Sequence, residues 1–146
     1  MKRLLALDYG HKRIGVALSD PLQIIAQPYD TWQNLSVEDV IERLSDLIRT
    51  KDVQLIVLGY PLTLKGDRKK LARQVEYFRL QLCCHINVPV ILWDERLTSV
   101  QAKKTMITMN EKPSHNKAKI DQIAASLLLQ NYIDARKKHT NSEESD

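Results

Sequence analysis

Acidic side chains stand at three places in the sequence where carboxylates could bind a divalent cation. Asp8 ends the apolar run "LLALD", Asp94 and Glu95 follow "VILW", and Asp121 lies within "KIDQIAASLLL". A carboxylate at the end of a buried apolar segment is costly unless something pairs with it. Hard oxygen ligands favour Mg²⁺ or Mn²⁺, and Mg²⁺ often binds one or two carboxylates together with substrate phosphate oxygens. The acids therefore suggest a Mg²⁺ or Mn²⁺ site that handles a phosphate.

Each acid also has a simpler interpretation. Asp8 precedes Gly10 and could be a turn residue. Asp94 and Glu95 could cap a following helix. Asp121 could interact with a helix dipole or pair with Lys117 on the same helix face. The metal interpretation gains weight only if the fold brings these acids to one end of one sheet.

The apolar patterning predicts five strands and several helices. A helix is expected after the N-cap Ser36, because apolar residues follow it at helical spacing. We expect the strands over residues 3–8, 13–19, 24–32, 53–58 and 88–93, and further helices over 67–85, 97–109 and 117–137, with a polar loop over 110–116.

This order of elements predicts an α/β fold with a mixed five-stranded sheet. The first three strands follow one another closely, so they can form an antiparallel meander. The last two are reached through helices, which makes them parallel to the first strand and places helices on both faces of the sheet. Ligands bind at the carboxyl ends of parallel strands in such sheets. Asp8, the Asp94–Glu95 pair and the loop 59–66 all fall at that end.

The chain of 146 residues is expected to form one domain over residues 1–138, followed by a disordered acidic tail over 139–146. The net charge is +4, and the tail holds three of the 18 acids but no Lys or Arg. The rest of the chain is therefore more basic than the total suggests, which suits a polyanionic partner such as nucleic acid.

Two further features bear on where the protein works. No apolar run approaches the roughly 20 residues that span a membrane. Cys83 and Cys84 are adjacent, so they do not form a disulfide framework, and no Cys/His spacing suggests zinc. A reducing compartment, hence the cytoplasm, is expected.

Four blocks of the chain resemble the YqgF/RuvX family, the Holliday-junction-resolvase-like proteins also described as pre-16S ribosomal RNA nucleases. The blocks are "LALDYGHKRIGVALSD", "VLGYPLTLKGD", "WDERLTSVQA" and "KIDQIAASLLLQNYID". The resemblance covers nearly the whole chain in the expected order. It departs from the usual pattern at Tyr60 and Thr63, where the family more often has Leu and Asn, and at Ala118, where Gly is common.

The resemblance implies an RNase H-like fold, a cytoplasmic location and a metal-dependent nuclease that matures the 5′ end of 16S rRNA. It places the catalytic and metal-binding acids on Asp8, Glu95 and Asp121, with Asp94 held in reserve. In a two-metal mechanism these carboxylates would hold Mg²⁺ or Mn²⁺ against the scissile phosphate.

Cations near these acids would bind the nucleic acid. A solvated hairpin tip explains His11, Lys12 and Arg13 equally well, whereas the basic run that begins at Lys65 lies beside the expected site and favours phosphate contacts. Arg96 could instead orient Glu95 through an ion pair, and Tyr9 and Tyr60 could stack on unpaired bases. The candidate nucleic-acid-binding residues are His11, Lys12, Arg13, Lys65, Arg68, Lys69, Arg96 and Lys117.

Two rival functions remain at this point. One is a DNA nuclease that resolves four-way junctions on the same fold. The other is a binding module associated with rRNA or the ribosome that lacks catalysis. Expected partners are pre-16S rRNA or branched DNA, and ribosomal particles, with the protein acting as a monomer or weak homodimer away from membranes.

Overall fold

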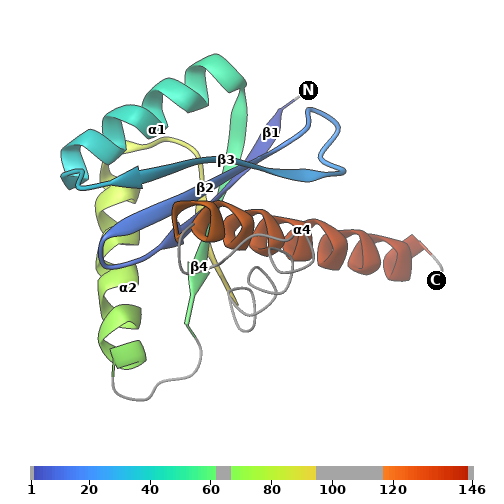
Figure 1. Cartoon of the computed structure of the whole chain (residues 1–146). Helices are drawn as coiled ribbons and strands as arrows, with labels where there is room; N and C mark the ends of the chain where they lie inside the picture. The colour runs from blue at the N-terminus through green and yellow to red at the C-terminus, as the bar shows by residue number, and fades with distance from the viewer. Residues whose placement is uncertain (1, 62–66, 95–116, 145–146) are drawn as a thin grey trace.

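The structure is a computed structural model of the chain, and it describes residues 2–61, 67–94 and 117–144. Its centre is a five-stranded sheet with the strand order β3-β2-β1-β4-β5 (Figure 1). The strands are β1 (Arg3–Tyr9), β2 (Arg13–Ser19), β3 (Ala26–Gln33), β4 (Val53–Tyr60) and β5 (Val90–Asp94). β1, β2 and β3 form an antiparallel meander, and β4 and β5 run parallel to β1. The predicted mixed sheet is confirmed.

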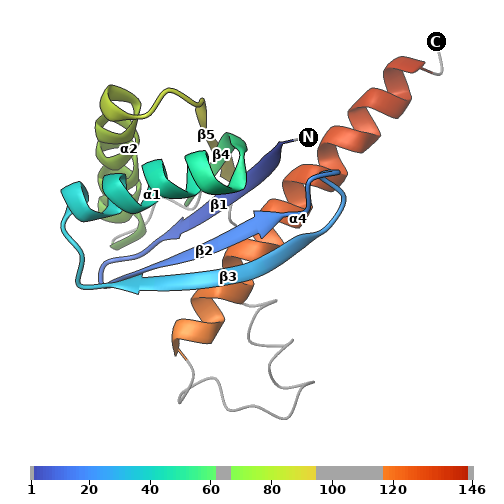
Figure 2. The same ribbon diagram turned by 90° about the horizontal axis from the view of Figure 1, so that it is seen from above.

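Helices cover both faces of this sheet, as predicted. α1 (Val37–Lys51) and α2 (Asp67–His85) lie on one face, and α4 (Lys117–Glu144) crosses the other (Figure 2). Figure 2 also shows the C-terminal turns of α4 extending past the sheet. The helix expected over 97–109 and the loop expected over 110–116 lie outside the described residues.

Each face of the sheet has its own core. On the α1/α2 face, Leu5 and Leu7 of β1 pack with Phe78 and other buried residues. On the α4 face, Leu4 and Ala6 of β1 pack with buried residues of α4, among them Ala125, Leu128, Leu129 and Ile133. Successive residues of a strand point to opposite faces. The two cores therefore identify the face on which every residue of β1 lies.

The start of α1 follows from its sequence. The Oγ of Ser36 accepts a hydrogen bond from the backbone N–H of Asp39, which confirms Ser36 as the N-cap. Acidic residues occupy the first turn and basic residues the last, in the order that the helix dipole favours. α1 ends at Asp52, whose φ of 54° is left-handed.

Two predicted boundaries need correction. β3 begins at Ala26 rather than at residue 24, because the amides of Ile24 and Ile25 donate to the carboxylate of Asp20 instead of joining the sheet. α4 continues to Glu144, although we expected it to end at about 137. No Gly or Pro occurs after Pro113 to stop the helix. The predicted domain over 1–138 and tail over 139–146 stay predictions. Within the described residues, no helix is long and apolar enough to cross a membrane.

Candidate functional site

Asp8 lies near the carboxyl end of the central strand β1 and is half-buried. Leu4 and Ala6 belong to the core on the α4 face, so the alternation of the strand places Asp8 on that face too. In the antiparallel ladder, Asp8 is opposite Gly15 of β2. The Cα atoms of such a pair are about 4.5–5.5 Å apart.

Asp121, near the start of α4, lies directly over Gly15. A Cβ atom built on Gly15 would be 2.0 Å from the backbone oxygen of Asp121 and 3.1 Å from its Cβ atom. Only a residue without a side chain lets the helix backbone come this close to the strand. Because Gly15 neighbours both acids, Asp8 and Asp121 lie at the same end and on the same face of the sheet.

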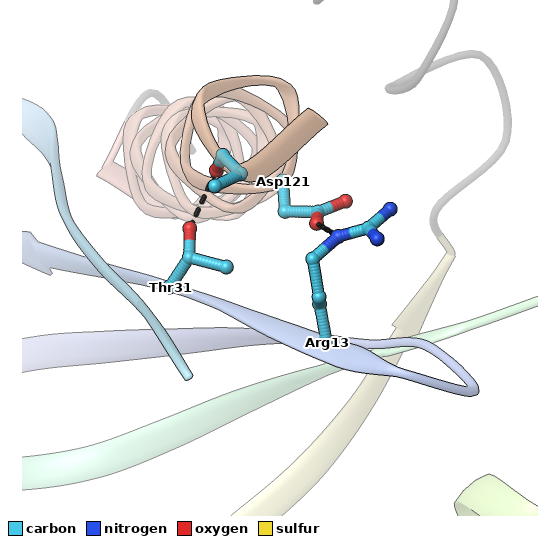
Figure 3. Close-up of polar contacts among 4 residues, drawn as sticks. Arg13, Thr31 and Asp121 are labelled. Atoms are coloured by element: carbon cyan, nitrogen blue, oxygen red, sulfur yellow. Dashed lines mark hydrogen bonds and ion pairs between the residues drawn. The ribbon is translucent and has the colours of Figure 1, made fainter. Parts of the chain in front are cut away.

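Arg13 holds the carboxylate of Asp121. Its Nε donates to Oδ2 of Asp121 at 2.6 Å, and the two side chains are 28% and 22% exposed (Figure 3). In the described part of the chain, the ion-pair partner of Asp121 is Arg13. The alternative pairing of Asp121 with Lys117 is therefore wrong. Arg13 was predicted to contact nucleic acid, and it contacts an acid of the candidate site.

A second contact fixes the first turn of α4 on the sheet. The hydroxyl of Thr31 in β3 donates to the backbone oxygen of Ala118, as Figure 3 shows beside the Arg13–Asp121 pair. Thr31 is opposite Gly15 in the β2–β3 ladder. Thr31, Gly15 and Asp8 thus form one row across three strands, and the start of α4 lies over that row.

Asp94, which was held in reserve as a ligand, falls on the other face. Trp93 packs against the core on the α4 face, whereas Tyr60, the register partner of Asp94, packs against the core on the α1/α2 face. Alternation then puts Asp94 on the α1/α2 face, away from Asp8. Glu95 is the next residue in the chain and lies outside the described residues.

Tyr60 is also directed away from the two acids. Its hydroxyl donates to Oε1 of Glu76 on α2 at 2.5 Å. This hydrogen bond is the main cause of the raised pKa of the Tyr60 hydroxyl, and desolvation and the charge of Glu76 raise the pKa further. Tyr60 therefore serves the contact between β4 and α2.

The predicted cations fall into three groups. His11 and Lys12 are exposed in the β1–β2 turn, which the backbone hydrogen bond from Gly10 to Arg13 closes at 2.9 Å. Lys69 in α2 and Lys117 at the start of α4 are exposed and lie on elements that cover opposite faces. The side chains of Lys65, Arg68 and Arg96 lie outside the described residues.

The donor chemistry of the site fits a hard divalent cation. Asp8 and Asp121 supply carboxylate oxygens on one face, which is the ligand type that Mg²⁺ and Mn²⁺ prefer. In residues 2–61, 67–94 and 117–144, no group of three or more His, Cys, Asp or Glu side chains could hold a metal ion. The third predicted ligand, Glu95, is beyond those ranges.

Gly15 and Thr31 were not singled out from the sequence, although they bring the site together. Gly15 did leave a signal, because an isolated glycine inside the strand "RIGVALS" often marks a close backbone approach. Thr31 left none, since a threonine in a strand is ordinary.

Comparison with known proteins places the chain in a family. The family described as "RuvX: Holliday junction resolvase" matches residues 2–135. The chain belongs to the RuvX family. A relative from Roseiflexus sp. (strain RS-1), described as "Putative pre-16S rRNA nuclease", is 41% identical over 92% of this chain and 96% of its own. A relative from Chloroflexus aurantiacus with the same description is 42% identical over 94% of this chain and 90% of its own.

Solved structures confirm the fold of this RuvX chain. The structure described as "T. thermophilus RuvC in complex with Holliday junction substrate" superposes with a TM-score of 0.59 and 15% identity, covering 94% of this chain and 96% of that one. The Fowlpox virus resolvase in complex with Holliday junction DNA gives a TM-score of 0.52 and 18% identity, covering 91% of this chain and 97% of that one. The predicted RNase H-like architecture is therefore confirmed.

Proposed function

We propose that this RuvX protein is a metal-dependent nuclease that hydrolyses phosphodiester bonds of pre-16S rRNA at its 5′ end. The observation that carries the proposal is the meeting of Asp8 and Asp121 over Gly15, beside the cationic β1–β2 turn. Family membership supports a hydrolase that acts on nucleic acid. The descriptions of the curated relatives favour pre-16S rRNA as the substrate.

Asp8, Asp121 and Glu95 would hold the divalent cations, Mg²⁺ or Mn²⁺. When bound, such cations would supply Lewis acidity to the scissile phosphate and lower the pKa of the attacking water. The carboxylates of Asp8 and Asp121 would balance this positive charge. Arg13, whose Nε is 2.6 Å from Oδ2 of Asp121, would compete with a bound cation for that carboxylate oxygen.

The exposed cations would bind the phosphates on either side of the scissile bond. His11 and Lys12 are closest in sequence to Asp8 and project from the turn that follows it. Phosphate contacts of this kind position a nucleic acid without reading its sequence. Lys69 and Lys117 are proposed for the same role, together with Lys65, Arg68 and Arg96, whose side chains lie outside the described residues.

A four-way DNA junction is the second candidate substrate. The printed description of the family names a Holliday junction resolvase, which favours this alternative. The same acids would serve either substrate, because the chemistry at the phosphate is the same. A ribosome-associated binding module without catalysis would need the cations but not the acids. Ribosomal particles as partners, a monomer or weak homodimer, and a cytoplasmic location remain predictions.

Cleavage assays with matched carboxylate variants test the proposal. A labelled 5′ precursor fragment of 16S rRNA and a four-way DNA junction are each incubated with Mg²⁺, with Mn²⁺ and with chelator. We expect metal-dependent cleavage of the rRNA fragment, and a loss of more than about a hundredfold in Asp8→Asn, Asp121→Asn and Glu95→Gln, because loss of a metal ligand removes several kcal/mol of transition-state stabilisation.

Asp94→Asn is the matched control, since Asp94 lies on the opposite face of the sheet. It is expected to keep most of the cleavage activity. Cleavage of the junction alone would assign the substrate to DNA. Equal activity in Asp8→Asn and the parent would refute the site, and RNA binding without cleavage would favour the binding module.

A further inference from the structure

A cavity of about 190 Å³ lies on the α1/α2 face, between the β1–β2 turn, the connection from β3 to α1 and the first turn of α1. Its inner wall is aromatic. Trp32 and Phe78 are only 3% and 2% exposed, so this wall is firmly packed. Tyr9 is half-buried and lies with its ring centroid 4.7 Å from that of Phe78. Tyr9 therefore lines the cavity with an aromatic ring that packs against Phe78.

The cations of the cavity lie on the side of the β1–β2 turn. His11 and Lys12 line one side and are exposed. On the other side α1 begins, and it contributes the apolar side chains of Val37 and Val40. A phosphate deep in the cavity would meet the apolar Trp32, Phe78 and Val40, whereas a phosphate on the side of the β1–β2 turn would meet His11 and Lys12. The lining thus favours an uncharged ring inside and its phosphate at the β1–β2 turn.

The exposed side chain of Asn34 also lines the cavity. Its amide carries two N–H donors and one oxygen acceptor, the groups that pair with the polar edge of a nucleobase. The volume is below the roughly 300–1,000 Å³ of pockets for drug-sized ligands. The cavity thus has room for one ring system rather than a whole nucleotide.

The cavity and the candidate site lie on opposite faces of the sheet, and the β1–β2 turn adjoins both. Tyr9 follows Asp8 directly, and the two side chains lie on opposite faces of β1. Arg13, which also lines the cavity, reaches Asp121 on the other face. A strand with its phosphate at Asp8 would pass this turn and bring a neighbouring base to the cavity.

We propose that this cavity binds one unpaired base of the nucleic-acid substrate. The base stacks on Tyr9, its polar edge faces Asn34, and the adjoining phosphate contacts His11 and Lys12. The inference rests on the proposed function, because it takes a single-stranded stretch of nucleic acid as the ligand. It adds a base-binding element to the reaction and requires the substrate to be unpaired beside the cleaved bond.

Binding of an end-labelled 12-nucleotide single-stranded RNA, followed by fluorescence anisotropy, tests the inference. The full chain carrying Asp8→Asn is used, so that affinity is measured without cleavage. Tyr9→Leu removes the stacking ring but keeps an apolar contact with Phe78. Base–aromatic stacking is worth about 1–3 kcal/mol per base. We therefore expect binding about five- to 150-fold weaker in Tyr9→Leu and within about twofold of the parent in Tyr9→Phe.

Tyr77→Leu is the matched control, because Tyr77 is 64% exposed on α2 and does not line the cavity. Its affinity for the RNA should equal that of the parent. Abasic nucleotides are then introduced one position at a time into the RNA. One position should lose affinity with the parent and lose nothing further with Tyr9→Leu, since the two changes remove the same contact.

The abasic scan on the parent keeps the inference testable even if Tyr9→Leu fails to fold. Uniform binding of every abasic RNA would overturn the inference and leave the proposed nuclease intact. Equal loss in Tyr9→Leu and Tyr77→Leu would overturn it as well. Absence of any RNA binding would overturn both the base site and the proposed substrate, whereas failed cleavage with base-dependent binding would overturn the nuclease alone.

Discussion

Gly15 and Asp121 are in backbone contact across the interface between β2 and α4. A Cβ atom on Gly15 would lie 2.0 Å from the carbonyl oxygen of Asp121 and 2.4 Å from its carbonyl carbon. Both atoms belong to the backbone, so no side-chain rotation can relieve the overlap. The position of the acid on α4 relative to Asp8 on β1 therefore depends on the absence of a side chain at residue 15.

Gly15→Ala should displace the start of α4 from the sheet. Overpacking typically costs about 1–3 kcal/mol, and we expect a loss at or above the upper end of this range, measured by urea denaturation. Cleavage of the rRNA fragment should fall as well, because Asp121 moves away from Asp8. Gly10→Ala is a graded comparison, since its Cβ would lie 3.0 Å from the oxygen of Arg13 and should cost less. Equal stability of Gly15→Ala and the parent would contradict the contact.

Arg13→Gln should strengthen the binding of Mg²⁺ and weaken the binding of the RNA substrate. Loss of the guanidinium removes a positive charge beside Asp121, so the Mg²⁺ concentration for half-maximal cleavage should fall by about fivefold, the equivalent of roughly 1 kcal/mol for a partly exposed pair. KM for the RNA should rise, because a cation near the phosphates is lost.

Arg49→Gln provides the control for Arg13→Gln. It breaks an ion pair of the same length, 2.6 Å to Asp46, on the surface of α1. Neither the Mg²⁺ requirement nor KM should change in this variant. A Mg²⁺ requirement that rises in Arg13→Gln would show that Arg13 supports metal binding rather than competing with it.

The strands and most helix starts could be predicted because they depend on local patterns. The alternation of side chains along β1 also gives the face on which Asp8 lies, once Leu4 and Ala6 are known to pack against α4. The contact between Arg13 and Asp121 could not be predicted. These residues are 108 positions apart, and their meeting depends on the rotation and position of α4 over the sheet. Side-chain packing over the whole sheet determines both.

The uncertainty over Asp94 had a similar origin. Adjacent residues of a strand point to opposite faces, so one residue of register decides whether Asp94 lies on the same face as Asp8. Tyr60 is opposite Asp94 in the register of β4 with β5. This register depends on how the two strands pack in the folded protein, so the local sequence pattern does not give it. The helix end expected at about 137 was wrong, because the polar residues that follow include no Gly or Pro to stop α4.

Lys12→Gln should lower the salt dependence of RNA binding. Each phosphate neutralised on a single strand contributes about −0.7 to the slope of log affinity against log salt, so the slope should become shallower by about 0.7. Lys51→Gln is the matched control. Lys51 is exposed in the last turn of α1, next to the start of β4, whereas the candidate site lies at the carboxyl ends of the parallel strands. Equal slopes in the two variants would exclude Lys12 from the phosphate contacts.

Asp20 organises the β2–β3 loop at the opposite end of β2 from Arg13. Its carboxylate accepts hydrogen bonds from the N–H groups of Leu22, Ile24 and Ile25 at 3.2, 2.7 and 2.8 Å. The N–H of Ile25 is the largest cause of the lowered pKa of Asp20. A carboxylate that binds protons less readily when folded stabilises the fold above its unfolded-state pKa, and this stabilisation disappears as the pH falls through its folded-state pKa.

Asp20→Ala should therefore speed hydrogen exchange at the amides of Ile24 and Ile25 near neutral pH. In the parent, the protection of these amides should be complete above the ordinary value of 3.8 and should fade only below it, since the folded pKa is lower. In Asp20→Ala the protection should show no such fall with pH. Asp46→Ala, which removes an exposed acid of α1, should leave both amides unchanged. Cleavage should persist in Asp20→Ala, because the loop is remote from Asp8, and protection equal to the parent's would show that backbone contacts alone hold the loop.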